Sequence, residues 1–162
     1  MNSFILRYLI ILTSGFWLDR WSKNLAVLFL EAQDYFVTPW LNFSLQWNRG
    51  VSFSWFTSYS TAGYVALTLG VFAVIVLFGF YTWGQYRTGK TLYGEMFVLA
   101  GAASNFVDRV RHGAVIDFID LHLGSWHFAT FNIADMCICA GITWLVLVQV
   151  KEVYDAKFEK NS

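Results

Sequence analysis

Long apolar segments are the feature that most limits how this chain can fold. Residues 62–83 include no Asp, Glu, Lys or Arg, and a helix needs about 20 apolar residues to cross a membrane. Three further apolar runs carry one charged residue each: residues 4–18 with Arg7, residues 92–106 with Glu95, and residues 133–150 with Asp135. We therefore predict four membrane spans, at about residues 4–18, 62–83, 92–106 and 133–150, within a single domain covering residues 1–162.

The composition agrees with lipid as the solvent. Hydrophobic residues make up 57% of the chain and charged residues only 14%, whereas a soluble domain carries about 25% charged residues. A surface this apolar would aggregate in water. The formal net charge is zero and no basic cluster stands out, which gives no indication of nucleic-acid binding.

Four spans would place residues 19–61 and 107–132 on one side of the membrane. The loop at 84–91 and the tail after residue 150 then lie on the other side, together with Arg7. That side has six of the eleven Lys and Arg residues, and the other five lie in or beside the polar motifs. Because cytoplasmic segments tend to carry Lys and Arg, we expect both termini in the cytoplasm. The two polar connections are then expected at the outer face.

The first of these connections has a strand pattern. Residues 41–48 alternate strictly between apolar and polar side chains, which is typical of a half-buried β-strand. Arg49-Gly50 offers a turn, after which Val51, Phe53 and Trp55 resume the alternation. The pattern predicts a β-hairpin lying at the membrane surface within residues 35–56, and an ordinary connecting loop is the alternative.

Two aspartates occupy apolar surroundings without a basic neighbour in the sequence. Asp117 lies within Val115-Ile116-Asp117-Phe118, and Asp135 lies at the start of the fourth predicted span. Two desolvated carboxyl groups that meet would share one proton, which is the arrangement that aspartic proteases use. From spacing alone, Asp108 and Asp120 are also candidates for such a pair.

Other polar clusters have more than one interpretation. Asp19 and Lys23 are four residues apart, so a helix would pair them on one face, and a structural ion pair is favoured over direct catalysis. Asn105 and Asp108 share a helix face next to Arg109. This second cluster fits a salt-bridged helix end, and it equally fits a site that contacts the carbonyl groups of a bound peptide.

Several other chemistries lack their motifs. His112, His122 and His127 form no His-Glu-x-x-His pattern, so surface positions are favoured for them. The sequence contains neither a Gly-Lys-Ser/Thr phosphate loop nor a Gly-x-Ser-x-Gly nucleophile elbow.

Five short motifs resemble, in order, those of the lipoprotein signal peptidases (signal peptidase II) of bacterial inner membranes. They are Asp19-Arg20-Trp21-Ser22-Lys23, Asn48-Arg49-Gly50-Val51-Ser52-Phe53, Ser104-Asn105-Phe106-Val107-Asp108-Arg109, Val115-Ile116-Asp117-Phe118 and Phe131-Asn132-Ile133-Ala134-Asp135. The resemblance extends over about residues 4–150. The one departure is Ser104, where the family usually has Gly.

This resemblance implies an all-α membrane protein with four transmembrane helices and a small extracytoplasmic β-cradle. It implies an aspartyl endopeptidase, without cofactor or metal, that removes the signal peptide from diacylglyceryl-modified prolipoproteins just before the lipidated Cys. The resemblance assigns catalysis to Asp117 and Asp135. The remaining residues that it implicates are Asn48, Asn105, Asp108, Arg109 and Asn132 near the active site, with Asp19 and Lys23 in support.

The resemblance also implies partners and a location. We expect contact with lipidated prolipoproteins and membrane lipids, inhibition by globomycin-type peptides, and a monomer in the inner membrane with its active site toward the outer face. The competing hypothesis is a non-enzymatic four-span transporter or assembly factor whose carboxylates bind a cation or relay protons.

Overall fold

Four long helices and a small antiparallel sheet make up the computed structural model, which describes residues 3–50 and 60–158. Its elements, in chain order, are α1 (Ser3–Leu30), β1 (Tyr35–Thr38), β2 (Leu41–Asn48), α2 (Thr61–Arg87), α3 (Tyr93–His112), β3 (Val115–Leu123), β4 (Trp126–His127) and α4 (Ile133–Phe158).

Each of the four predicted apolar runs corresponds to one helix that extends beyond the run at its C-terminal end, and Leu92, the first residue of the third run, is the N-cap of α3. The largest difference is at α1, which continues to Leu30 rather than ending near residue 18. The helix continues because the charges of Asp19 and Lys23 are paired within it at 2.7 Å instead of facing water. By length and composition, the described helices that could cross a membrane are α2 and α4, so the structure alone supports two of the four predicted spans.

Helix α2 shows why lipid is the appropriate solvent. It begins at Ser60, whose Oγ accepts a hydrogen bond from the Gly63 N–H at 3.1 Å. Large apolar side chains such as Leu69, Leu77 and Phe80 are more than 60% exposed along it. A helix that is apolar around its whole circumference requires an apolar environment, and here the protein covers little of that surface.

Helices α3 and α4 approach each other closely through small residues. A Cβ atom added at Gly101 would lie 2.2 Å from the carbonyl oxygen of Ala134, and one added at Gly141 would lie 2.5 Å from the carbonyl oxygen of Gly94. Neither position can hold a larger side chain without movement of the backbone. This contact fixes the start of α4 against the middle of α3.

The sheet has the order β1-β2-β3-β4, with each neighbouring pair antiparallel. Residues 41–48 form the predicted strand, and β3 pairs with it so that Gln46 lies opposite Asp117. The expected return strand at Val51, Phe53 and Trp55 lies outside the described residues. The sequence pattern did not predict β3, because its first four residues are buried and it therefore lacks clean alternation.

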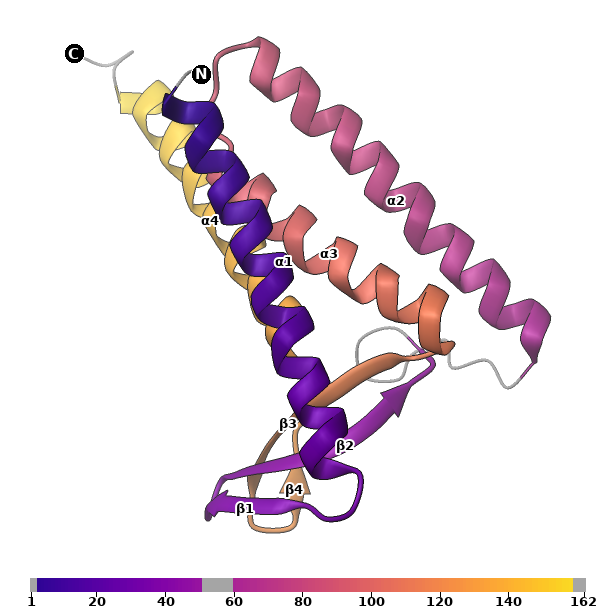
Figure 1. Ribbon diagram of the computed structural model, residues 1–162. Coiled ribbons are helices and arrows are strands. Elements are labelled where there is room, and N and C mark those ends of the chain that lie inside the picture. The colour runs from indigo at the N-terminus through magenta and orange to yellow at the C-terminus, as the bar shows by residue number, and fades with distance from the viewer. Residues whose placement is uncertain (1–2, 51–59, 159–162) are drawn as a thin grey trace.

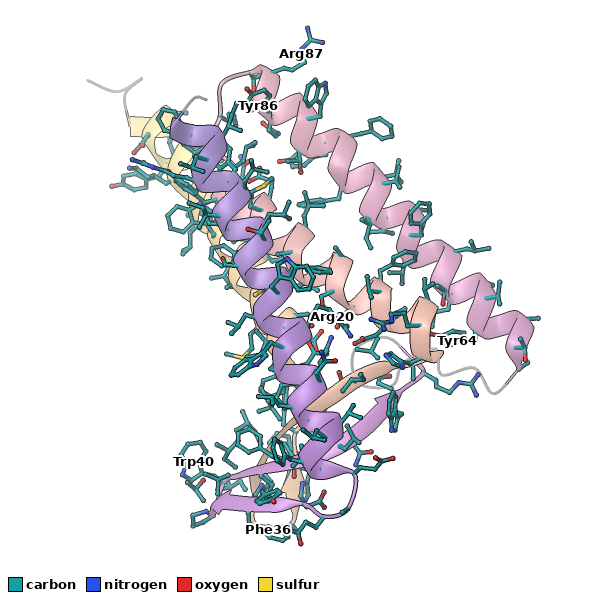
Figure 2. The ribbon with its side chains drawn as sticks, in the orientation of Figure 1. Arg20, Phe36, Trp40, Tyr64, Tyr86 and Arg87 are labelled. Carbon is teal, nitrogen blue, oxygen red and sulfur yellow. The ribbon has the colours of Figure 1, made fainter. Side chains whose placement is uncertain are left out.

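The sheet and the two chain ends lie at opposite ends of the helix bundle (Figure 1). The sheet follows the C-terminal ends of α1 and α3 and precedes α4, so the polar residues at these helix ends are brought together. Phe36 and Trp40 project from the free tip of the sheet (Figure 2), with 80% and 55% of their surfaces exposed. Such exposed aromatic side chains are typical of protein at a membrane surface.

Candidate active site

Asp117 is a buried carboxylate near the start of β3, and two amides donate hydrogen bonds to it. Asn48 at the end of β2 donates from Nδ2 to Oδ2 at 2.9 Å. Asn132 donates from Nδ2 to Oδ1 at 2.6 Å. The pairing of β2 with β3 brings Asn48 to the aspartate, although the two residues are 69 positions apart in the chain.

Asp135 lies in the first turn of α4, where its side chain caps the helix. Its Oδ2 accepts a hydrogen bond from the main-chain N–H of Asn132 at 3.2 Å, and its own N–H donates to Asn132 Oδ1 at 2.9 Å. This reciprocal pattern satisfies N–H groups at the helix start. The other oxygen, Oδ1, accepts from Asn105 Nδ2 of α3 at 2.8 Å.

Asn132 is therefore bonded to both aspartates, one through its side chain and the other through its main chain. Its position follows from β3, because the carbonyl of Phe131 accepts hydrogen bonds from the N–H groups of Phe118 and Ile119 at 3.0 and 2.8 Å. The backbone thus holds residue 132 beside Asp117, at the beginning of α4.

The two carboxyl groups interact electrostatically. Burial, and next the negative charge of Asp135, raises the pKa of Asp117 to about 7, against the lowering effect of the Asn48 and Asn132 hydrogen bonds and of Lys23. Burial raises an acid's pKa because it disfavours the charged form. A carboxyl group with this pKa is partly protonated at neutral pH, so the pair can both accept and donate a proton.

A second cluster, fully buried, surrounds Lys23. Its Nζ lies 2.7 Å from Asp19 Oδ2, 2.8 Å from Asp108 Oδ2 and 2.6 Å from Asn105 Oδ1. The predicted ion pair between Asp19 and Lys23 is thus confirmed. Lys23 donates a hydrogen bond to the side-chain oxygen of Asn105, whose amide nitrogen donates to Asp135. The ion cluster therefore holds the Asn105 side chain against Asp135.

Arg20 and Ser104 complete this cluster. Arg20, labelled in Figure 2, pairs with Asp108, and Ser104 Oγ donates to Asp19 Oδ2 at 2.6 Å. Sequence reasoning did not select Arg20, although a cation so close to an apolar run requires a partner and could have been found on that basis. Because two cations neutralise Asp108, it is a poorer candidate for proton transfer than Asp117.

Arg109 lies beside the carboxylates with unused hydrogen-bonding capacity. Its Nη2 donates to the carbonyl oxygen of Gly50 at 2.8 Å. Its Nε and Nη1 are buried and make no hydrogen bond to any residue of segments 3–50 and 60–158. Tyr64 of α2, labelled in Figure 2, donates from its hydroxyl to the Arg109 carbonyl at 3.1 Å. These contacts hold Arg109 in place through its Nη2 atom and its main-chain carbonyl.

A cavity of about 550 Å³ opens beside the two aspartates. Its polar lining consists mainly of Asn48, Asn105, Arg109, Asp117, Thr130 and Asp135. Its apolar lining includes Val71, Leu121, Phe128, Phe131, Met136 and Ile138. Carboxylates and other polar groups that share a cavity with many apolar side chains fit a site that cuts a bond within a largely apolar substrate.

The remaining candidate, Asp120, lies in a different environment. It is near the sheet edge, where His127 Nδ1 lies 3.0 Å from both of its carboxylate oxygens. Asp120 is absent from the lining of the cavity that holds Asp117 and Asp135. Of the four aspartates that the sequence left open, Asp117 and Asp135 are the two that line this cavity.

Comparison with known proteins gives consistent matches along most of the chain. A family model described as "Signal peptidase (SPase) II" matches residues 11–151. A lipoprotein signal peptidase of Coxiella burnetii (strain RSA 493 / Nine Mile phase I) is 37% identical over 135 residues, which cover 80% of this chain and 81% of that protein. One from Francisella tularensis subsp. novicida (strain U112) is 36% identical over 149 residues, covering 90% and 89%.

Solved structures agree at the level of the fold. A bacterial membrane enzyme determined by the in meso method at 1.9 Å resolution superposes with a TM-score of 0.74 at 23% identity, covering 91% of this chain and 94% of the other. A second one, at 2.3 Å resolution, gives the same TM-score at 21% identity, with coverage of 92% and 90%. The arrangement of helices and sheet is thus shared with membrane enzymes.

Proposed function

This chain belongs to the signal peptidase II family, whose members remove signal peptides from prolipoproteins, and we propose that it does so as an aspartic endopeptidase using Asp117 and Asp135. One observation carries the proposal: Asn132 is hydrogen bonded to both carboxylates, and both line one cavity. The other oxygen of each carboxylate accepts a hydrogen bond from a second amide, that of Asn48 for Asp117 and that of Asn105 for Asp135.

The proposed reaction requires one proton shared by the two carboxyl groups. The ionised aspartate takes a proton from a water molecule while the oxygen of that water attacks the scissile carbonyl carbon. The protonated aspartate donates to the carbonyl oxygen, which gives a neutral tetrahedral intermediate. When the C–N bond breaks, the leaving nitrogen takes a proton from one carboxyl group, while a hydroxyl group of the intermediate returns a proton to the other, which restores a pair with one shared proton. The shared proton belongs to the pair as a unit, so we assign it to neither residue.

We propose that Arg109 binds the substrate. Arg109 lines the cavity, and its buried Nε and Nη1 atoms have no hydrogen-bond partner among the described residues. Guanidinium donors of this kind suit the carbonyl groups of an extended peptide next to the scissile bond. The apolar wall formed by residues such as Met136 and Phe128 suits the side chains of a signal peptide or the acyl chains of a diacylglyceryl-modified Cys.

We propose that the buried charged residues around Lys23 affect the catalytic pair indirectly, through hydrogen bonds to the residues beside it. Lys23 contacts Asn105, and Asn105 contacts Asp135, which forms a chain of hydrogen bonds from the ion cluster to the catalytic pair. Asp19 accepts a bond from the main-chain N–H of Ala134 at 2.7 Å, next to Asp135. Asp108 neutralises Lys23 and Arg20. These residues position the site rather than touch the substrate.

For the membrane arrangement, we propose that all four helices cross the inner membrane, with both termini in the cytoplasm. Support comes from the position of the chain ends opposite the sheet (Figure 1) and from the apolar surfaces of α2 and α4. The catalytic pair then lies near the outer face, where a membrane-anchored prolipoprotein presents its cleavage site. We further propose that one domain, as a monomer, contains the whole site, that catalysis uses no metal or cofactor, and that globomycin-type peptides block it.

The test is processing of a lipidated prolipoprotein by purified variants in detergent. We expect Asp117→Asn and Asp135→Asn each to abolish cleavage, because each removes a group that must exchange protons, while both variants keep the melting temperature of a folded protein. Asp34→Asn is the matched control, since Asp34 is exposed and distant in sequence from the site. Full turnover by either active-site variant would falsify the proposal. A transporter or assembly factor would show no cleavage by any variant, including the wild type.

A further inference from the structure

Three potential metal ligands gather on β3 and on the edge strand β4. Asp120, His122 and His127 each offer a ligand atom, and these atoms all lie within 4.8 Å of one another. None of the three has a part in the proposed reaction.

Strand geometry explains why these side chains meet. Asp120 and His122 are two residues apart on β3, so they project from the same face of the sheet. His127 is the antiparallel partner of His122 across β3 and β4, and directly paired residues share a face. The two imidazole rings are accordingly stacked, with their centroids 5.1 Å apart and their planes at 20°.

Two buried polar atoms in or beside the cluster have no hydrogen-bond partner among the described residues. His122 Nδ1 is buried and has no hydrogen-bond partner in the described part of the chain, and the same is true of Asn42 Oδ1. Asn42 is 93% buried and lies directly opposite Asp120, with its Nδ2 3.4 Å from Asp120 Oδ2. A polar atom that is buried without a partner destabilises the fold, so two of them near one carboxylate indicate a missing partner.

A histidine–aspartate ion pair does not account for the whole arrangement. His127 Nδ1 is 3.0 Å from the Asp120 oxygens, as expected for such a pair. His122 Nδ1 lies 3.9 Å from Asp120 Oδ2, beyond hydrogen-bond distance, and it still faces the same carboxylate. A cation placed between the three groups would bond to His122 as well.

We propose that Asp120, His122 and His127 bind a divalent transition-metal ion, best represented by Zn²⁺. Two imidazole nitrogens and one carboxylate oxygen are a ligand set that zinc accepts, with ligand distances of about 2.0–2.2 Å. Such distances place neighbouring ligand atoms roughly 3–3.5 Å apart, so His127 needs little movement and His122 needs a small side-chain rotation. His127 is 54% exposed, which provides a route for the ion.

The bound ion would stiffen one wall of the cavity. It would join β3 to β4, where the Phe128 N–H donates to the Leu121 carbonyl oxygen at 2.7 Å, and both of these residues line the cavity. The metal contacts neither Asp117 nor Asp135, so its role is structural. The proposal therefore does not depend on the peptidase mechanism.

The experiment uses untagged protein in detergent from which metal has been removed with a chelator. Zn²⁺ alone is titrated into it, binding is measured by calorimetry, and the melting temperature is measured at each zinc concentration. We expect saturable binding of one ion per chain and a melting temperature that rises with zinc concentration, because the ion binds the folded state. The variants His122→Ala and His127→Ala should bind at least about tenfold more weakly. Their melting temperature should no longer respond to zinc.

The matched control is His112→Ala, because His112 is an exposed histidine outside the cluster. It should bind zinc like the wild type. His127→Ala removes a half-exposed side chain and should fold normally even where His122→Ala does not, so the test remains decisive. Equal zinc binding by the wild type and His127→Ala, or no saturable binding by the wild type, would overturn the proposal. Peptidase activity should persist in His127→Ala and in chelator, which separates this site from the catalytic pair.

Discussion

The side-chain amide of Asn132 donates a hydrogen bond of 2.6 Å to Oδ1 of Asp117. Because Asn132 also bonds to Asp135 through its main chain, this residue aligns one carboxyl group with the other. Under the proposed mechanism Asn132 is a positioning residue, and its loss should reduce the rate of the chemical step more than substrate binding.

We therefore expect Asn132→Ala to lower kcat about tenfold or more with a smaller change in KM, since hydrogen bonds to charged groups are each worth about 1.5–3 kcal/mol. Steady-state cleavage of a lipidated prolipoprotein measures both constants. Asn24→Ala is the control, because Asn24 is exposed on α1. A kcat for Asn132→Ala equal to that of the control would refute this positioning role.

Peptidase activity should decline as the pH rises through about 7. Burial, followed by the charge of Asp135, raises the pKa of Asp117 to about 7, and the pair loses its shared proton above that pH. Without this proton, no group donates to the scissile carbonyl oxygen. The measurement is a pH–rate profile of kcat/KM, and a rate that stays constant well above pH 7 would contradict the expectation.

The same raised pKa predicts how stability depends on pH. An unfolded aspartate titrates near pH 4, about three units below folded Asp117, so the folded state binds more protons between these two values. The free energy of unfolding must then fall as the pH rises from about 4 to 7. Asp117→Asn should remove this contribution. As the pH rises from about 4 to 7, the melting temperature of the variant should therefore rise relative to that of the wild type. A difference between the two melting temperatures that stays constant from about pH 4 to pH 7 would contradict this prediction.

Ser104 should stabilise this chain where its family usually has Gly. Its Oγ donates to Asp19 Oδ2 at 2.6 Å in a fully buried position. We expect Ser104→Ala to cost about 1.5–3 kcal/mol of unfolding free energy through the lost bond. Ser104→Gly should cost a further 1 kcal/mol or so through helix propensity. Thermal melting of the two variants in detergent checks the order, and a Ser104→Gly protein as stable as the wild type would show that the hydroxyl contributes nothing.

Gly101 should tolerate no side chain. A Cβ atom there would lie 2.2 Å from the Ala134 carbonyl oxygen, so Gly101→Ala must push α4 away from α3 at a cost of about 1–3 kcal/mol or more. Because Ala134 adjoins Asp135, activity should fall together with the melting temperature. Gly70→Ala in α2 is the control, since nothing lies within 4 Å of its added Cβ atom. If both variants melt at the same temperature, the close contact does not limit the packing of these helices.

The sequence by itself determined the helices and the identity of the polar residues. The long apolar runs required four helices, because an apolar chain in lipid must satisfy its backbone hydrogen bonds internally. The alternation at residues 41–48 predicted β2, and the four-residue spacing of Asp19 and Lys23 predicted their ion pair. These features follow from local periodicity, which a single sequence displays directly.

Only the tertiary structure decided which aspartates line the same cavity. Asp108, Asp117, Asp120 and Asp135 were all plausible partners in the sequence, since none carries a local signal of what it contacts. The pairing of β3 with β2 and with Phe131 brings Asp117 to Asn132, while Lys23 and Arg20 neutralise Asp108 and the histidines surround Asp120. Those contacts join residues far apart in the chain, so they depend on how the helices and strands pack and not on any local pattern.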